Sequence, residues 1–452
     1  MKRRIIIITA TALIGVAAGS SILMSEPNPG PPGERPELAR IGALGVGTLV
    51  EDIALRPRAR ITTLGAVTGN LPVENRSLKV RIWYPASVTG ASKRILYSHD
   101  LQLPGKPLFK ISSQGVAVDG AAVVSGKRFP LILLSHGYGG WSEYSSQLAE
   151  LLVTKGYVVA AINHNDLPFD GTRSFLISFG SVLMDRAEDQ RQVLAAILKR
   201  AATDKTGFAS VVDAQKIGLI GYSMGGYGAL STAGASYDPK SKTISQLPES
   251  AKAVALASDP AMAARIKAVV LLAPWGGQPD SRVWTQQSLA AVKAPVLMIS
   301  GDHDDVVNFK QGVSWIFDHL SGTERRMLVY REARHNIAGN PVPVDDETDF
   351  QTLEFFTEPV WRTERLVRIN QHFISAHFDA VLKGDASKAA YLNMPTAKAG
   401  DGNWPSKPGD QWGGTFAGAD QPQHWRGFQR RWALGLEWHT ASKGQLTTLS
   451  AR

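Results

Sequence analysis

Short apolar segments alternate along the chain with segments of helical periodicity. Residues 129–137, "FPLILLSHG", and 156–164, "GYVVAAINH", are nearly continuous apolar runs. Runs of this kind predict strands that are buried on both faces. Residues 77–86, "SLKVRIWYPA", alternate between apolar and polar positions and predict a half-buried strand. Four more strands are predicted at 216–221, 266–274, 295–300 and 326–331.

Helical segments separate these strands. Within residues 142–155, Leu148, Leu151 and Leu152 have helical spacing, and residues 185–201 carry a second apolar helix face. Buried strands joined by helices predict a mostly parallel sheet covered on both faces. Right-handed crossovers then give one doubly wound α/β domain. In such sheets the functional residues follow the carboxyl ends of the strands.

The strand at 216–221 runs into "GYSMGG", residues 221–226. This matches the G-x-S-x-G pattern, in which a sharp strand-to-helix turn presents a nucleophilic serine above the sheet. The alternative is a packing turn that happens to contain a serine. The apolar strand before it and the small residues Gly226, Gly228 and Ala229 after it favour the nucleophile, Ser223.

The strand at 295–300 is followed by "GDHDDVV", in which Asp302, Asp304 and Asp305 compete for the role of the acid. Asp304 lies three residues after Gly301 and just before two valines, a position from which a carboxylate can accept the Nδ1–H of an imidazole. Asp302 and Asp305 are expected to cap or tie the loop. The cluster lacks the alternation and length of a calcium loop, so no metal site is predicted.

The strand at 326–331 is followed by "REARHNIAG", which contains His335. The chain has ten histidines, and their order relative to the other candidates selects this one. Nucleophile, acid and histidine follow one another in the order Ser223, Asp304, His335, which is the order of α/β hydrolases. His372 and His377 lie on a helix-like segment, where packing or exposure is expected.

An acyl-transfer site also needs backbone N–H groups aimed at the developing oxyanion. The residue after the nucleophile, Met224, is one predicted donor. The loop "SHGYGG", residues 135–140, follows an earlier strand and supplies Tyr138 as the second. His136 is expected to brace this loop.

The N-terminus carries a basic start, an apolar run from Ile5 to about Ala18 and then small residues. This layout predicts a secretory signal peptide over residues 1–24 and an exported, periplasmic or secreted protein. An uncleaved membrane anchor over residues 5–24 is the alternative. Residues 25–45 follow as a linker rich in proline and glycine.

Composition adds little that is specific. The chain has 452 residues, a net charge of +9 and no cysteine, which excludes disulfides, thiolate metal sites and a cysteine nucleophile. Its basic residues are scattered, so a solvated basic surface is expected and no nucleic-acid partner is predicted. The oligomeric state is left open.

Several motifs together resemble the α/β-hydrolase superfamily, and more narrowly the predicted dienelactone hydrolases and the class II platelet-activating-factor acetylhydrolases. They are "VRIWYPA", "FPLILLSHGYGG", "LLVTKGYVVAAINHND", "DRAEDQRQVL", "GYSMGGYG", "APW" and "HFDAVLKGD", which span about residues 80–385 in that order. Dienelactone hydrolases use a cysteine nucleophile, whereas this chain has Ser223. The resemblance therefore implies serine-esterase chemistry.

A second likeness is to polyester-degrading cutinases, including PET hydrolases, through the Gly-Tyr loop, the G-x-S-M-G-G turn and "APW". It implies that Tyr138 and Met224 are the oxyanion donors and that Trp275 lines a substrate subsite. These enzymes are much shorter than this chain.

Two regions exceed a minimal hydrolase domain, which is expected over residues 46–394. Residues 231–261 form either a cap over the site or a surface insertion. Residues 395–452 form a C-terminal extension with five tryptophans in its first part. Packing of these aromatics back onto the domain is expected, and an aromatic substrate surface is the alternative.

The sequence thus predicts a serine carboxylic-ester hydrolase that acts through Ser223, His335 and Asp304 on a small-molecule, lipid or polymer ester. No cofactor or metal is expected. The alternatives are a polyester hydrolase, an acyltransferase or a peptidase with the same triad, or a non-catalytic binding protein. A membrane is expected as a partner only if the N-terminal segment is retained.

Overall fold

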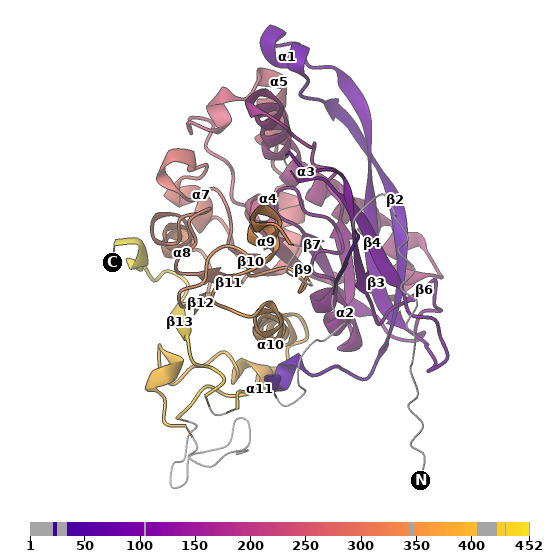
Figure 1. Ribbon diagram of the computed structural model, residues 1–452, viewed down its shortest axis with the longest axis vertical. Coiled ribbons are helices and arrows are strands. Elements are labelled where there is room, and N and C mark those ends of the chain that lie inside the picture. The colour runs from indigo at the N-terminus through magenta and orange to yellow at the C-terminus, as the bar shows by residue number, and fades with distance from the viewer. Residues whose placement is uncertain are drawn as a thin grey trace, which may run out of the picture.

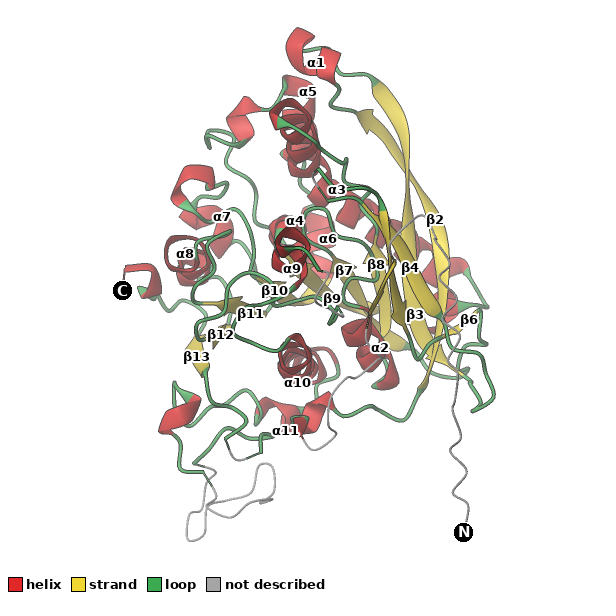
Figure 2. Cartoon of the chain, in the orientation of Figure 1, coloured by secondary structure: helices red, strands yellow, loops and turns green. Residues whose placement is uncertain are grey.

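The computed structural model describes residues 21–24, 34–103, 105–342, 348–404, 423–429 and 431–451. Its centre is a ten-stranded sheet with the strand order β13-β12-β11-β10-β9-β7-β8-β3-β2-β6 (Figure 1). A smaller three-stranded sheet, in the order β1-β5-β4, lies beside it. Figure 2 shows the strands of the large sheet enclosed by helices.

Parallel strands form the middle of the large sheet and antiparallel strands its edges. The parallel strands are β7 (Phe129–Ser135), β8 (Val158–Ile162), β9 (Val212–Tyr222), β10 (Ile266–Leu272), β11 (Val296–Gly301) and β12 (Arg325–Tyr330). The antiparallel additions are β2 (Gly45–Ala59), β3 (Val73–Ala86) and β13 (Leu436–Ala441), and β6 (Val118–Asp119) pairs in parallel with β2. The small sheet comprises β1 (Ser21–Met24), β4 (Leu96–Leu101) and β5 (Phe109–Gln114).

Helices cover both faces of the parallel strands, because these strands are apolar on both sides. Figure 1 shows α2 and α10 on one side of the central strands and α3 and α4 on the other. The bounds of these helices are Ser146–Thr154 for α2, Thr172–Thr203 for α3, Met224–Thr232 for α4 and Thr363–Leu382 for α10. The shorter helices are α1 (Thr63–Thr68), α5 (Glu249–Ala255), α6 (Pro260–Arg265), α7 (Gln286–Ala290), α8 (Ser314–His319), α9 (Phe350–Phe356) and α11 (Ala386–Ala389). The predicted α/β class with a mostly parallel sheet is confirmed.

The register of the sheet brings the predicted functional segments to one edge. Leu272 pairs with Tyr222 and with Ile299, and Gly301 pairs with Tyr330. Ser135 at the end of β7 pairs with Gly221. The carboxyl ends of the five neighbouring strands β7, β9, β10, β11 and β12 therefore lie level with one another. The segments that follow β7, β9, β11 and β12 start from this common edge, which is where a doubly wound sheet places its site.

Several elements differ from the sequence-based expectation, among them α3 and β2. The helix predicted over 185–201 begins much earlier, at Thr172, where the Ser174 hydroxyl accepts the N–H of Gly171 at 3.1 Å. The intervening glycine and serines weaken its helical pattern. Strand β2 was not predicted, since it is partly polar, and it pairs with β3 over most of its length.

The insertion at 231–261 and the C-terminal extension both contact the domain. In the insertion, α5 packs against α3 and β2. In the extension, Trp425 and Trp438 are buried, and β13 extends the large sheet by pairing with β12. Residues 405–422 of the extension lie outside the described residues.

Most of the predicted signal peptide and linker lies outside the described residues, namely residues 1–20 and 25–33. Among the helices that the structure does describe, none combines the length and the apolarity needed to cross a bilayer.

His372 on α10 is expected to make the fold sensitive to acid. It is fully buried, its Nδ1 accepts the N–H of Leu38 at 3.2 Å, and burial followed by the charge of Lys155 lowers its pKa to about 3. Because its pKa in the folded state lies below the unfolded value of about 6.5, its contribution to stability is present above pH 6.5 and is lost as the pH falls toward 3.

The variant His372→Asn keeps a side-chain acceptor for Leu38 N–H but does not titrate. Between pH 7 and pH 4, its unfolding free energy should fall by up to about 3 kcal/mol less than that of the parent chain. Urea unfolding at the two pH values measures the difference. Equal losses in both proteins would show that His372 does not titrate on unfolding.

Candidate active site

Ser223 lies at the turn between β9 and α4. Its backbone has φ 52° and ψ −115°, a left-handed conformation that is uncommon for a residue with a side chain. The turn is held by its own peptide groups. Ser223 N–H donates to Leu272 O at 2.9 Å, and Ser223 O accepts from Gly226 and Trp275 at 2.9 and 3.1 Å. Strain of this kind, held by surrounding bonds, is typical of functional sites.

Glycines at this turn permit the close approach of α4 to the sheet. A Cβ at Gly225 would lie 2.0 Å from Ser135 O, and a Cβ at Gly221 would lie 2.4 Å from Gly225 O. No side chain fits at either position without moving the backbone. The sequence pattern around Ser223 therefore has a packing cause, and it also leaves the serine at the apex of the turn.

His335 faces Ser223 from the loop after β12. Its Nε2 lies 3.1 Å from Ser223 Oγ, and its Nδ1 lies 2.7 Å from Asp304 Oδ2. The Asp304 carboxylate accepts at Nδ1, so Nδ1 carries the proton and Nε2 is left as an acceptor for the serine hydroxyl. The three side chains predicted from the sequence are thus brought into one hydrogen-bonded row.

The three acidic residues after β11 have different partners. The other oxygen of Asp304, Oδ1, accepts the N–H groups of Val306 and Val307 at 3.0 and 3.1 Å, and its side chain is fully buried. Asp302 accepts from Glu332 N–H and pairs with Arg331 at 3.1 Å, while Asp305 pairs with Arg334. In the described part of the chain, no cluster of three acidic or histidine side chains could hold a metal ion.

Tyr222 is a neighbour of His335 that the sequence did not single out. Its hydroxyl donates to His335 O at 3.2 Å, and its ring lies 5.2 Å from the imidazole. The ring of Tyr144 stacks on that of Tyr222 with 5.7 Å between ring centres. Tyr222 therefore fixes the backbone of His335. Its position next to the nucleophile was the only available signal.

The loop after β7 lies against the serine. A Cβ at Gly137 would lie 3.3 Å from Ser223 Cβ, so the backbone passes close to the nucleophile. Among the hydrogen bonds of the described residues, none uses the N–H of Tyr138 or of Met224. Met224 is the first residue of α4, where N–H groups have no acceptor within the helix. Met224 thus follows Ser223 directly and Tyr138 follows the glycine that contacts it, and the N–H groups of both are unused within the described residues.

His136 sets the direction of one of these donors. Its Nδ1 donates to Gly137 O at 2.6 Å, and its Nε2 accepts from His164 N–H at 3.2 Å. Burial, followed by the charge of Arg186, lowers the pKa of His136 well below its usual range, so the ring is neutral. In a trans peptide the carbonyl and the next N–H point in opposite directions. Holding Gly137 O toward His136 therefore turns Tyr138 N–H away from it.

Trp275, the predicted subsite residue, follows β10. The residue is 8% exposed, and its indole contacts the rings of Tyr227 and Phe179 edge-on, at 5.7 and 5.3 Å between ring centres. Phe179 in turn lies 5.8 Å from Tyr138. Ring contacts through Phe179 and Trp275 thus connect Tyr138 in the loop after β7 to Tyr227 in the helix that follows Ser223. A role for Trp275 in substrate binding stays a prediction.

A second row of serine, histidine and aspartate lies inside the domain. Ser135 Oγ is 2.7 Å from His164 Nε2, and His164 Nδ1 is 3.0 Å from Asp189 Oδ2. All three are at most 2% exposed. Asp189 is already paired with Arg58 and Arg76, and burial lowers the pKa of His164 to about 4. This row lacks an exposed turn and is a structural network.

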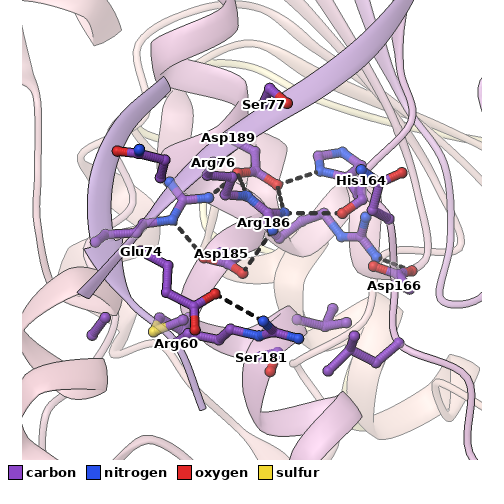
Figure 3. A pocket seen from close by; sticks show the side chains of 17 residues that line it. Arg60, Glu74, Arg76, Ser77, His164, Asp166, Ser181, Asp185, Arg186 and Asp189 are labelled. Carbon is purple, nitrogen blue, oxygen red and sulfur yellow. Dashed lines mark hydrogen bonds and ion pairs between the residues drawn. The ribbon is translucent and has the colours of Figure 1, made fainter. Parts of the chain in front are cut away.

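The network borders a cavity of about 330 Å³ between the β2–β3 hairpin and α3 (Figure 3). Arginines and carboxylates line it in pairs, including Arg76 with Asp189 and Arg60 with Glu74. Burial and the neighbouring charge of Asp189 raise the pKa of Asp185 to about 6. In the strand order, β7 and β8 separate β9, which leads to Ser223, from β3 and β2, whose residues line this cavity.

Residues 71–175 match the family model of platelet-activating factor acetylhydrolase, isoform II. The match contains the first three of the motifs that carry the resemblance, and it ends before Ser223. Among solved structures, a ferulic acid esterase from Streptomyces cinnamoneus is similar, with 20% identity and a TM-score of 0.47. The alignment covers 75% of this chain and 91% of that one. No curated protein matches the chain.

The resemblance to the class II acetylhydrolases is therefore supported over residues 71–175. The strand order and the turn at Ser223 are those of an α/β-hydrolase fold. The prediction of a hydrolase that acts on carboxylic esters agrees with this match. The matched residues include the loop at Tyr138 but neither the serine, the acid nor the histidine.

Proposed function

We propose that this protein is a serine carboxylic-ester hydrolase that works through an acyl-enzyme intermediate. The observation that carries the proposal is the row formed by Ser223 Oγ, His335 Nε2, His335 Nδ1 and Asp304 Oδ2, with separations of 3.1 and 2.7 Å across its two hydrogen bonds. It lies beside two unused N–H groups. This is the arrangement that acyl transfer to a serine requires.

Each residue has one role in the proposed reaction. His335 Nε2 takes the proton of Ser223 as the serine oxygen attacks the ester carbonyl. The N–H groups of Tyr138 and Met224 stabilise the oxyanion, and the Asp304 carboxylate stabilises the imidazolium. His335 then protonates the leaving alcohol. Water then attacks the acyl-enzyme while His335 Nε2 takes its proton. His335 returns that proton to Ser223 Oγ as the acid is released, which restores the serine.

No cofactor or metal takes part in this scheme. The acyl acceptor is proposed to be water, and the same site with an alcohol as acceptor would be an acyltransferase. A polymer ester is an alternative substrate. Export of the protein, expected from its N-terminus, is part of the proposal.

The test is covalent labelling of the intact protein by a fluorophosphonate during hydrolysis of p-nitrophenyl butyrate. We expect the activity to fall in step with the addition of one phosphonyl group, and peptide mass spectrometry to find that group on Ser223. Full activity after stoichiometric labelling, or a label on another residue, would contradict the proposal.

A further inference from the structure

A buried ion pair reaches the loop that carries one of the proposed oxyanion donors. The carboxylate of Asp166 accepts the N–H of Gly139 at 2.9 Å and also accepts from Arg186 Nη2 at 2.7 Å. The two side chains of the pair are 6% and 0% exposed. Figure 3 shows them side by side, with the dashed line that joins them. The catalytic scheme above uses neither residue.

The contact with Gly139 bears directly on Tyr138. The N–H of Gly139 and the C=O of Tyr138 belong to one rigid peptide unit. His136 fixes the preceding unit through Gly137 O. Both peptide units that flank Tyr138 are therefore held, one by His136 and the other by Asp166. Gly139 has a φ of 69°, and a glycine leaves this peptide unit more conformational freedom than another residue would, so the contact with Asp166 helps to fix it.

The turn after β8 aims Asp166 at the loop. Asn165 has φ 55°, a left-handed conformation that costs energy and that asparagine tolerates better than most residues. It turns the chain so that Asp166 enters the interior. There the charge of Arg186 keeps the pKa of Asp166 below its usual value, although burial acts in the opposite direction. The acceptor of Gly139 N–H is thus a carboxylate.

Arg186 has little else to bond with. It is on α3, and its Nε and Nη1 atoms have no hydrogen-bond partner within the described residues. A buried guanidinium is costly unless it is paired. Asp166 and Arg186 therefore depend on each other. Together they tie α3 to the loop.

We propose that Asp166, held by Arg186, is a positioning residue that fixes the oxyanion loop with Tyr138 N–H aimed at the reacting carbonyl oxygen. This inference rests on the proposed ester hydrolysis at Ser223. Asp166 does not touch the substrate. Its removal should weaken stabilisation of the tetrahedral intermediate and leave ground-state binding of the ester nearly unchanged.

The experiment compares Asp166→Ala and Asp166→Asn with the parent chain, using p-nitrophenyl butyrate as substrate and phenylboronic acid as a tetrahedral-adduct inhibitor. We expect Asp166→Ala to lower kcat per folded molecule by roughly 10- to 100-fold, the range for a small displacement of a catalytic group. KM should change by less than about 3-fold, and the inhibition constant should rise by about the same factor as kcat falls.

Asp166→Asn keeps a neutral acceptor for Gly139 N–H and should lose only roughly 3- to 10-fold in kcat, because charge-assisted hydrogen bonds are about twice as strong as neutral ones. This variant also decides the matter if Asp166→Ala does not fold. The matched control is Asp318→Ala. Asp318 is also a buried carboxylate that accepts backbone N–H groups, but those of Leu449 and Ser450.

A purely structural role would lower the melting temperature of the Asp166 and Asp318 variants alike and leave kcat per folded molecule and the boronate inhibition constant unchanged. That result would overturn the inference. If Ser223→Ala is inactive in the same assay, only the positioning role fails. If Ser223→Ala remains active, the proposed function itself fails.

Discussion

Ser223→Ala is expected to lower kcat/KM for p-nitrophenyl butyrate by about 10⁴- to 10⁶-fold, the range found when the nucleophile of a serine hydrolase is removed. The reason is geometric. Ser223 Oγ is the atom that lies 3.1 Å from His335 Nε2, so alanine removes the nucleophile itself. The backbone at this position keeps a strained φ of 52°, which serves to present that oxygen. The variant should also lose labelling by a fluorophosphonate.

The matched control is Ser135→Ala, the same substitution in the second row of serine, histidine and aspartate. Ser135 is 2% exposed, and its partner His164 pairs with an aspartate already neutralised by two arginines. This variant should stay within about 10-fold of the parent in kcat/KM, since it loses one buried hydrogen bond. Circular dichroism and thermal melting check that both variants are folded.

The activities of Ser223→Ala and Ser135→Ala distinguish the row at Ser223 from the interior row at Ser135. A folded Ser223→Ala protein that hydrolyses the ester at the parent rate would contradict the assignment of the nucleophile. A loss confined to Ser135→Ala would move the assignment to the interior row. A third variant, Ser223→Gly, should be inactive but more stable by about 1 kcal/mol, because glycine adopts a positive φ without strain.

The sequence predicted those parts of the site that follow directly from local pattern. Each predicted strand of the parallel sheet is present, and the residues that follow β7, β9, β11 and β12 are the ones that meet around Ser223. Chain order chose His335 among ten histidines. Periodicity and strand ends are local signals, and the rules of parallel sheets convert them into a shared edge.

Contacts that join distant loops were beyond this reasoning. The bond from Gly139 to Asp166 and the bond from Tyr222 to His335 depend on how two loops face each other. No local pattern encodes such a meeting. The early start of α3 was missed for a related reason, since Gly171 caps it with a backbone conformation and not with a characteristic side chain. The contacts that hold the catalytic residues in place are thus harder to predict from the sequence than the catalytic residues themselves.

Asp304→Asn is the second substitution with a large expected effect, about 10³- to 10⁴-fold on kcat. The loss comes from the histidine tautomer. Asp304 Oδ1 accepts two backbone N–H groups, so the amide oxygen of an asparagine would occupy that side. Its NH₂ group would then face His335 Nδ1 and donate to it. The imidazole would carry its proton on Nε2 and could no longer accept that of Ser223.

The same loop offers two controls with the same chemical change. Asp302→Asn and Asp305→Asn remove carboxylates that pair with Arg331 and Arg334, both of which are partly exposed. The Asp305 pair is exposed and contributes little, and an asparagine at 302 can still accept the N–H of Glu332, so each variant should keep kcat within about 3-fold of the parent. Steady-state kinetics and the melting temperatures of the three proteins make the comparison. A large loss in Asp302→Asn or Asp305→Asn, with Asp304→Asn active, would assign the acid to another residue of the loop. A loss shared by all three would instead point to the stability of the loop as a whole, because only the carboxylate at Asp304 reaches the imidazole.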